Sequence, residues 1–417
     1  MTTRSDFDRT LTDWLAEVRP TVTPAGLLDE ALERVAVTRR RRPWLILDRW
    51  TWSARVRDWS SAGRVLATAA VLLLLLLAMI AASILIGAPQ PAPPFGLANP
   101  GYITIDAGDG IVVARIDGSE RHVLVPPAGQ SVSPIWSRDG LHLAFWHRTL
   151  ADDPWSLVVV DRDGDGRTVV ADDVTLRNRE EALNQPSNLT WSPDSRRIAF
   201  AADTPEGTAI FVVDRGAHGA TRITDPALGA IDPAWSPDGS TIVFVSVATT
   251  TLHGVGPDGT DEHEIADLKD VVLWPDWSPD GGLVAVSAVV GDQLDVFTIT
   301  ADGKAVTNVS HDPSDEYSPS WSPDGKRLAW ARAPADESAR AWVVVTDRDG
   351  TRLVEMRLPA DLAPPVWSPD GTRLYSYVTN DDGEFHQILV LDPEGVAPAV
   401  RIPAEGNVGN GSWQRLP

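Results

Sequence analysis

Hydrophobic residues follow two different patterns along the chain. Residues 65–87 are an unbroken run of 23 uncharged residues, in which positions 72–77 are all leucine. From residue 101 onward, short stretches of alternating apolar and polar residues recur, as in Arg-Leu-Ala-Trp at 327–330. A long apolar run is typical of a membrane-spanning helix, whereas alternation is typical of strands with one buried face. The pattern predicts a transmembrane helix followed by an all-β domain.

The apolar run is long enough to cross a bilayer once. As a helix it would extend roughly 34 Å, and the hydrocarbon core is about 30 Å thick. Eight arginines lie between residues 39 and 64, and no Lys or Arg follows the run until Arg115. Because positively charged flanks stay in the cytoplasm, we expect residues 63–87 to contact membrane lipid, with the N-terminus inside. This predicts a single-pass plasma-membrane protein with an extracytoplasmic C-terminal domain.

Residues 1–62 are expected to form a cytoplasmic segment. Apolar side chains at helical spacing predict two short amphipathic helices, and four tryptophans interleaved with arginines favour a juxtamembrane helix along the inner leaflet. The pattern leaves open whether this segment is a bundle without a partner or a regulatory module that binds one. Residues 88–100 contain five prolines and no charge, which predicts an extended stalk before the domain at 101–417.

A tryptophan motif recurs through the C-terminal domain. The sequence Trp-Ser-Pro-Asp-Gly occurs unchanged four times, with three degenerate copies. Successive tryptophans are 55, 44, 42, 44, 46 and 46 residues apart, and a period in the forties is typical of the four-stranded blades of a propeller. The tryptophans that we expect to anchor the repeats are Trp136, Trp191, Trp235, Trp277, Trp321, Trp367 and Trp413.

The motif has a local physical reason. Ser-Pro-Asp-Gly suits a type I turn, because Ser can bond back to the backbone, Pro presets φ and Gly closes the turn. The tryptophan ends the strand before the turn as a core anchor, and three more strands follow in each unit. We therefore expect every unit to be a sheet of four strands.

Counting the units predicts how the ring closes. Six complete units begin at Trp136 through Trp367. Before them, residues 102–105, 111–115 and 122–125 predict three strands, and residues 407–413 predict one more. Together these make a seventh blade, in which the N- and C-terminal strands leave no free sheet edge. We predict an all-β, seven-bladed β-propeller, with six blades as the alternative.

The tandem Trp-Ser-Pro-Asp-Gly units over residues 100–417 resemble the repeats of TolB-type propellers, which are periplasmic components of bacterial envelope complexes. The resemblance implies a propeller fold and an envelope location. TolB proper has six blades, a different preceding domain and a cleaved signal, whereas this chain has the features of a membrane-anchored form. The resemblance therefore does not carry over TolB's own partners.

Charge is distributed unevenly along the chain. The net charge is −22, but residues 1–64 carry 12 Arg against 9 acidic residues, which leaves 24 basic and 49 acidic residues for the rest. A domain with a balance of −25 repels phosphate groups, so we expect no nucleic acid partner. The chain has no cysteine, which excludes disulfides and thiolate sites.

One aspartate-rich stretch matches a calcium loop. Asp161, Asp163 and Asp165 have the Asp-x-Asp-x-Asp-Gly spacing, with Asp172 at the twelfth position. The twelfth residue is Asp rather than the bidentate Glu, and the context is a hairpin. Asp-Gly pairs also occur at the corresponding turn of other units, so turn chemistry is the alternative explanation. Calcium at these four residues is the one cofactor that the sequence suggests.

Motifs for catalysis are not found in the sequence. The eight histidines lack a metal-binding spacing, and the Gly-x-Ser-x-Gly elbow of propeller peptidases is absent. We therefore expect no catalytic or cofactor-binding residues and a non-enzymatic binding or scaffold protein. Its ligand could be a protein, a glycan or a small molecule. The alternatives are a transmembrane sensor that couples an external ligand to the N-terminal module, and a propeller hydrolase.

Overall fold

The computed structural model describes residues 95–106, 110–176, 189–269, 272–333, 341–358, 364–379, 385–403 and 412–417. Residues 89–417 belong to one compact unit. Within the described residues, no helix has both the length and the apolar character needed to cross a bilayer. The predicted cytoplasmic helices, the transmembrane run at 65–87 and most of the proline-rich stalk lie outside the described residues.

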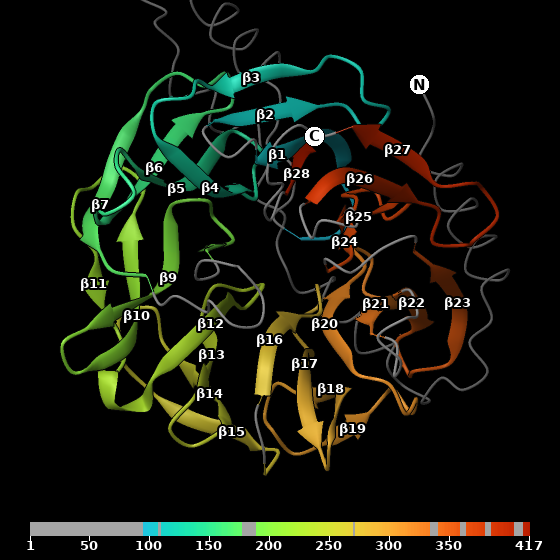
Figure 1. Ribbon diagram of the computed structural model, residues 1–417. Coiled ribbons are helices and arrows are strands. Elements are labelled where there is room, and N and C mark those ends of the chain that lie inside the picture. The colour runs from blue at the N-terminus through green and yellow to red at the C-terminus, as the bar shows by residue number, and fades with distance from the viewer. Residues whose placement is uncertain are drawn as a thin grey trace, which may run out of the picture. The chain divides into compact units, whose positions relative to one another are not determined.

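Seven antiparallel sheets of four strands each surround a central axis (Figure 1). The strands near the axis begin each blade, and the later strands lie progressively further out, as Figure 1 shows for β12 to β15. The prediction of a seven-bladed all-β propeller is confirmed, and the six-bladed alternative is wrong. The one helical element named among the described residues is a 3-10 turn at Pro226–Leu228.

The first blade combines both ends of the domain, and blades two to four follow in chain order. Their strands, from the axis outward, are β28 (Trp413–Leu416), β1 (Asn99–Asp106), β2 (Ile111–Ala114) and β3 (His122–Val125); β4 (Gln130–Trp136), β5 (His142–Arg148), β6 (Trp155–Asp161) and β7 (Thr168–Val174); β8 (Thr190–Trp191), β9 (Arg197–Thr204), β10 (Gly207–Asp214) and β11 (Thr221–Arg222); β12 (Ala230–Trp235), β13 (Ile242–Ser246), β14 (Thr251–Val255) and β15 (His263–Asp267).

Blades five to seven repeat the same order. Their strands are β16 (Val272–Trp277), β17 (Leu283–Val290), β18 (Gln293–Thr300) and β19 (Val306–Asn308); β20 (Glu316–Trp321), β21 (Arg327–Arg332), β22 (Trp342–Asp347) and β23 (Arg352–Arg357); β24 (Val366–Trp367), β25 (Leu374–Thr379), β26 (Phe385–Leu391) and β27 (Val400–Pro403).

The ring closes by pairing β28 with β1. Asn99 pairs with Leu416 and Ile103 pairs with Trp413, across a register shift. The final strand therefore begins at Trp413, whereas the sequence predicted it to end there. The reason is that no Ser-Pro-Asp-Gly turn follows this tryptophan, so the chain continues extended along β1. The strand shared by the two chain ends is confirmed.

The blade tryptophans form the contacts between neighbouring blades. All seven are at most 7% exposed. Four indole N–H groups donate to the carbonyl oxygen just before the tryptophan of the preceding blade. These bonds are Trp191 to Ile135 (3.1 Å), Trp277 to Ala234 (3.2 Å), Trp367 to Ser320 (3.0 Å) and Trp413 to Val366 (3.4 Å). Large apolar side chains fill the space between twisted sheets, which single blades are too thin to bury.

The segment before β1 lies against the propeller. The Ala98 N–H donates to the Pro369 carbonyl at 2.8 Å, and Leu97 approaches Gly371. Residues 95–98, which belong to the predicted stalk, thus contact the propeller. These contacts place residues 95–98 among the motif turns, where they become part of the site described next.

Candidate functional site

The motif turns share one hydrogen-bond pattern. In blade four, the Ser236 hydroxyl donates to Asp238 Oδ1 at 2.6 Å and accepts the Thr241 N–H at 3.0 Å, and the Gly239 N–H donates to the Ser236 carbonyl. These bonds hold the pKa of the Asp238 carboxyl below its usual value, chiefly through Ser236. We call the end of the propeller that carries these turns the turn face. The opposite end, where β4, β12, β16 and β20 begin, is the loop face.

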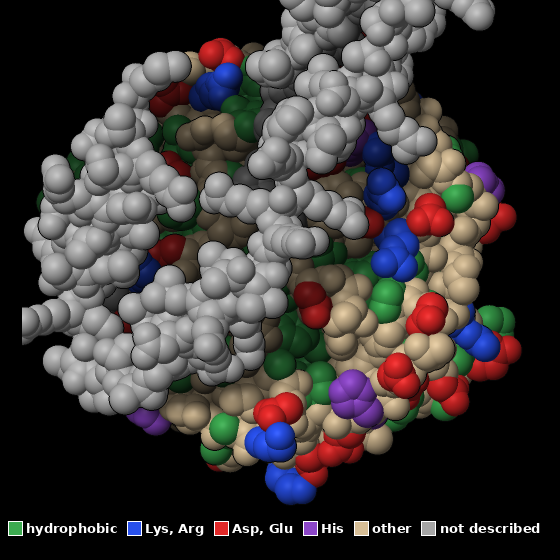
Figure 2. Space-filling view, turned by 180° about the vertical axis from the view of Figure 1, so that it is seen from behind, with side chains coloured by type: hydrophobic (Ala, Val, Ile, Leu, Met, Phe, Trp, Pro, Cys, Tyr) green, Lys and Arg blue, Asp and Glu red, His purple; other side chains and the backbone are tan. Residues whose placement is uncertain are grey.

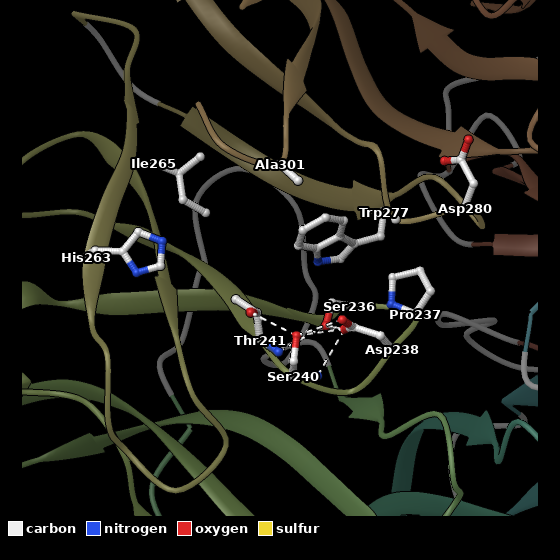
Figure 3. A pocket seen from close by; sticks show the side chains of 11 residues that line it. Ser236, Pro237, Asp238, Ser240, Thr241, His263, Ile265, Trp277, Asp280 and Ala301 are labelled. Carbon is white, nitrogen blue, oxygen red and sulfur yellow. Dashed lines mark hydrogen bonds between the residues drawn. The ribbon is translucent and has the colours of Figure 1, made fainter. Parts of the chain in front are cut away.

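A pocket of about 430 Å³ opens between blades four and five beside these turns (Figure 3). Trp277 and Asp280 line it from one blade, and His263 and Ile265 line it from the other. Figure 3 shows that the polar groups of Ser236, Asp238, Ser240 and Thr241 hydrogen-bond to one another. Because the turn uses these groups internally, the pocket offers few of them to orient a ligand.

The four predicted calcium ligands lie in and beyond the hairpin between β6 and β7. The Asp161 N–H donates to the Asp165 carbonyl and the Gly164 N–H donates to the Asp161 carbonyl, both at 2.8 Å. Asp163 lies 3.7 Å from Arg162, and Asp172 on β7 lies 3.5 Å from His218. Within the described residues, no group of three or more His, Asp or Glu side chains could hold a metal ion. The geometry thus favours turn chemistry here, and the calcium site stays a prediction.

In two neighbouring blades, arginine stands where the motif has proline. Five motif copies carry Pro as the second residue after the tryptophan, but Trp136 is followed there by Arg138 and Trp413 by Arg415. Their blades are adjacent, and a Cβ on Gly140 would lie only 1.8 Å from the Arg415 carbonyl oxygen. Two arginines therefore lie near each other at the turn face, where the other five motif copies carry proline.

Arg138 is partly buried and forms no ion pair with the other residues that the structure describes. Its guanidinium lies 4.6 Å from the centroid of the Phe95 ring, and no hydrogen bond or salt bridge to the other described residues involves its side chain. Burial lowers the pKa of Arg138. Arg415 donates to the Gly96 carbonyl at 2.6 Å, and burial together with the charge of Arg138 lowers its pKa to about 10.

One carboxylate faces these arginines from the other side of the ring. Asp276 on β16 interacts electrostatically with Arg138, and its Oδ2 accepts the Trp321 N–H at 2.8 Å. Burial raises the pKa of Asp276 to about 6, although both partners work in the opposite direction.

Further along the inner strands, four equivalent residues have left-handed backbone. Each lies three residues before the blade tryptophan, with φ of 53° at Ser133, 51° at Asp232, 52° at Trp274 and 55° at Ser318. Register shifts mark the same position in each of these blades. Serine and aspartate tolerate this conformation, whereas a bulky residue there is an outlier. Trp274, which is partly exposed, is therefore the unusual member of the set.

Trp274 lies beside a second aromatic ring, whose chain neighbour belongs to a buried ion pair. Its ring centroid is 5.9 Å from that of Tyr317. The neighbouring Glu316 is 0% exposed and accepts from Trp330 Nε1 and Arg332 Nε, both at 2.9 Å. Arg332 also contacts Glu355 at 2.7 Å, and these bonds outweigh burial, so the pKa of Arg332 is raised. With Asp312 at 3.3 Å from Arg332, the cluster holds three carboxylates and one guanidinium.

The position of the Glu316–Arg332 pair is occupied by different residues in the other blades. Glu316 pairs with Arg332, whereas the equivalent pair is Val272 with Ala288 in blade five, Ala230 with Ser246 in blade four, and Ser131 with His147 in blade two. Ser131 and His147 are both buried and joined by a 3.0 Å hydrogen bond. Burial lowers the pKa of His147. The loop-face ends of the blades have thus diverged, while the turns have not.

Charges on the outer rim are more evenly spread. On the face shown in Figure 2, acidic side chains lie at intervals along the rim with basic ones between them. Exposed aspartates such as Asp302 pair with a nearby lysine, and Lys304 lowers the pKa of Asp302 to about 2. The charged residues of the rim therefore resemble those of an ordinary solvated surface.

Part of this site could be recognised from the sequence. Arg138 and Arg415 stand in the two copies whose motif is degenerate, and the substitution of proline by arginine was visible there. Nothing in the sequence indicates that Asp276 interacts electrostatically with Arg138, because the two residues belong to blades five and two. The pair of Glu316 with Arg332 likewise depends on strand register, which only the structure gives.

We compared the chain with known protein families and with curated proteins. No protein-family model matches the chain. It is 25% identical over 241 residues to the uncharacterized peptidase YuxL of Bacillus subtilis, which covers 54% of the chain and 34% of that protein. It is 28% identical over 106 residues to a TolB homolog of Chlorobium luteolum, which covers 25% of the chain and 24% of the homolog. The chain therefore spans about a third of the first relative's length.

Among solved structures, a prolyl endopeptidase superposes with a TM-score of 0.55 at 16% identity, covering 74% of the chain and 50% of that structure. This likeness shows a shared propeller fold. The comparisons contradict the expectation that the chain is not an enzyme, because YuxL is named a peptidase and the endopeptidase shares the fold. The absence of a hydrolase motif was therefore not sufficient to exclude an enzymatic protein family.

Proposed function

We propose that the chain is a single-pass membrane protein whose extracytoplasmic propeller binds peptides and takes part in their processing. The propeller fold and the TolB likeness are consistent with a binding role in the bacterial envelope. The name of YuxL supports a peptide as the ligand and processing as the context. The charge and apolar pattern of residues 39–87 support the anchor and its orientation.

The observation that carries the binding role is Trp274. A partly exposed tryptophan in left-handed backbone is strained by roughly 1–3 kcal/mol, and strain of this kind gathers at functional sites. The repeat does not require it, because serine occupies the equivalent position at Ser133 and Ser318. Together with Tyr317 it offers aromatic surface on the inner strands, which suits peptide side chains and backbone.

Peptide binding can be tested with the full chain in detergent micelles. We expect Trp274→Ser to weaken the binding of fluorescent peptides from a mixed library at least tenfold, which corresponds to about 1.4 kcal/mol. Thermal stability should be unchanged or higher, because the substitution relieves strain. Trp155→Ser, on the half-buried outer strand β6, is the matched control. Equal peptide affinities for Trp274→Ser and wild type would refute the role of this surface, and mass spectrometry of the same samples reports any cleavage.

The anchor is tested separately in the native host. We expect the full chain to remain in the membrane pellet after alkaline carbonate washing, and a variant without residues 65–87 to be released. Protease added to spheroplasts should remove the propeller and spare an epitope within residues 1–62. Digestion of that epitope in intact spheroplasts would contradict the proposed orientation.

A sensor role is the second candidate, and the predicted amphipathic helices in residues 1–62 favour it. In that case, peptide binding outside changes which cytoplasmic protein the N-terminal segment holds. Crosslinking from residues 1–62 in membranes, with and without added peptide, distinguishes the two. A crosslinking pattern that is identical in both conditions would leave binding without signalling.

A further inference from the structure

The pocket between blades four and five lies against a blade tryptophan, Trp277, that has no cation over its ring. Three other blade tryptophans have a guanidinium over the indole. These pairs, with the distance from guanidinium carbon to ring centroid, are Arg197 with Trp235 (4.9 Å), Arg327 with Trp367 (4.7 Å) and Arg348 with Trp321 (5.6 Å). No guanidinium among the residues that the structure describes lies over Trp277, which at 7% is the most exposed of the seven blade tryptophans.

One substitution in the repeat accounts for the missing cation. Arg197 and Arg327 are each the sixth residue after the tryptophan of their own blade, and each reaches the tryptophan of the next blade. The equivalent residue of blade four is Thr241. In all three blades this residue's backbone N–H donates to the motif serine, at 2.9 to 3.0 Å, so only the side chain differs. Thr241 and Trp277 both line the pocket (Figure 3), which thus takes the place that an arginine side chain fills elsewhere.

The groups that hold such a guanidinium have counterparts around the pocket. In the interface of blades six and seven, the arginine donates to the Gly371 carbonyl and to the Glu394 carboxylate, both at 2.8 Å. The glycine at the same motif position of blade five is Gly281, which lines the pocket. Glu394 directly precedes the glycine of its hairpin, and the equivalent residue of blade five is Asp302, next to the lining residue Ala301. Hydrogen-bond acceptors of the same kind are therefore present.

The motif aspartate of blade four also lacks the positive charge that its counterparts have. Burial raises the pKa of Asp194 and Asp324, but hydrogen bonds and the charges of the two arginines at the sixth position bring it below the usual value. At Asp238 the pKa is lowered by hydrogen bonds, chiefly from Ser236, and within the described part of the chain no Lys or Arg pairs with it. Asp238 thus lines the pocket as a carboxylate without a basic partner.

We propose that this pocket binds the guanidinium group of an arginine side chain in a peptide ligand. The indole of Trp277 faces the cation, the Gly281 carbonyl and the Asp302 carboxylate accept its N–H groups, and Asp238 adds a negative charge. Asp302 now pairs with Lys304 at the surface, and an exposed pair of this kind is easily exchanged. The choice of a peptide rests on the proposed function above, but the pocket does not include Trp274.

The test compares two six-residue peptides that differ in one residue, arginine or the uncharged and nearly isosteric citrulline. Each has a neutral fluorophore at its N-terminus and an amidated C-terminus. With the full chain in detergent micelles, we expect the arginine peptide to bind roughly tenfold tighter or more. Thr241→Arg should remove this preference, because its own guanidinium fills the pocket as Arg197 and Arg327 do in their interfaces. Thr372→Arg, at an exposed turn residue of blade seven, adds the same charge elsewhere and should behave as wild type.

Two further measurements keep the test independent of folding. Thermal unfolding of Thr241→Arg should occur at the wild-type temperature or above, because two other blades carry arginine at this position. Asp302→Asn changes an exposed hairpin residue, and it should weaken the arginine peptide roughly threefold and leave the citrulline peptide unchanged. A folded Thr241→Arg variant that keeps the full preference for arginine would overturn the proposal.

Trp274→Ser separates the pocket from the peptide-binding surface of the proposed function. This variant should weaken both peptides and leave the ratio of their affinities unchanged. If the arginine peptide is preferred and Trp274→Ser weakens neither peptide, the arginine pocket stands and the role of Trp274 fails. If the two peptides bind wild type equally and Trp274→Ser weakens both, the function stands and the arginine pocket is overturned. If neither peptide binds, both are overturned.

Discussion

Two aspartates of blade five, four residues apart, have opposite environments. Asp280 belongs to the motif turn, where Arg348 and Ser278 donate to it, and the Arg348 hydrogen bond is the largest cause of a pKa near 2. Asp276 belongs to the channel, where burial raises its pKa to about 6. The first carboxylate is satisfied by its own turn and its neighbour, whereas the second is held in an unfavourable environment.

The contrast extends to the two regions that these residues represent. The turn-face motif repeats the same serine, aspartate and glycine bonds from blade to blade, and its polar groups are used internally. The inner-strand positions before each tryptophan differ from blade to blade and include a strained residue, Trp274, and a buried charged residue, Glu316. Repetition therefore marks the scaffold, and departure from repetition marks the candidate site.

The largest effect should follow from opening the ring. Deleting residues 412–417 removes β28, whose Trp413 is buried and whose backbone pairs with β1. Loss of one buried tryptophan alone destabilises a fold by about 3–5 kcal/mol, and here an entire inner strand is lost. We expect cooperative thermal unfolding to disappear in calorimetry. Deleting Pro417 alone is the control, and a deletion variant with a wild-type transition would contradict closure by the two chain ends.

The buried ion pair on the loop face should give the next largest effect. Arg332→Ala leaves the fully buried Glu316 unpaired, and breaking such a pair is destabilising by about 3–5 kcal/mol. Replacing both by the blade-five residues, Glu316→Val with Arg332→Ala, should be milder than the single change. Urea unfolding of the three proteins measures this order. A double variant less stable than Arg332→Ala would show that the pair is not the source of the effect.

Asp276→Asn should change the pH dependence of stability. Because the folded pKa is raised above the unfolded value, the wild type loses stability as pH rises from about 4 to about 6 and stays lower above that. A shift of two units corresponds to up to about 3 kcal/mol. We therefore expect the variant to unfold at a higher temperature than wild type at pH 7.5 and at the same temperature at pH 3.5. The reverse order would exclude the buried position of this carboxyl.

Asp280→Asn should have the smallest effect and the opposite sign. Its folded pKa is depressed, so its contribution to stability is present above about pH 4 and is lost as the pH falls toward 2. Since the side chain is 55% exposed, solvent screening limits the contribution to below about 1 kcal/mol. Thermal unfolding between pH 2 and 5 should be slightly less pH-dependent in the variant. A steeper dependence would contradict the ion pair with Arg348.

Most of the scaffold could be predicted from the sequence, because the turn of each blade is formed by consecutive residues. The tryptophan spacing gave seven units, and the motif gave the type of turn. The final strand was placed on the wrong side of Trp413, since the motif does not show what the chain does when its turn is missing. The aspartates at 161–172 match a calcium pattern, and the hairpin bonds of Asp161 and Asp165 offer turn chemistry as the other explanation, so the calcium site stays a prediction.

The candidate site was much harder to predict from the sequence. Its contacts join residues that are far apart in sequence, such as Trp274 and Tyr317. Register decides the partner of Glu316, and the bulge decides the backbone of Trp274. The enzyme prediction failed for a different reason, because a missing motif says little about a protein family whose members share the propeller.

The most direct test of this account is Trp274→Ser, which gives blade five the residue that Ser133 and Ser318 supply at the equivalent position of two other blades. Its thermal unfolding and its affinity for the fluorescent library peptides are measured on the same preparation. We predict an unfolding temperature equal to or above that of wild type, together with a loss of peptide binding of at least tenfold. A variant that is destabilised but still binds the peptides would show that Trp274 belongs to the scaffold and not to the site.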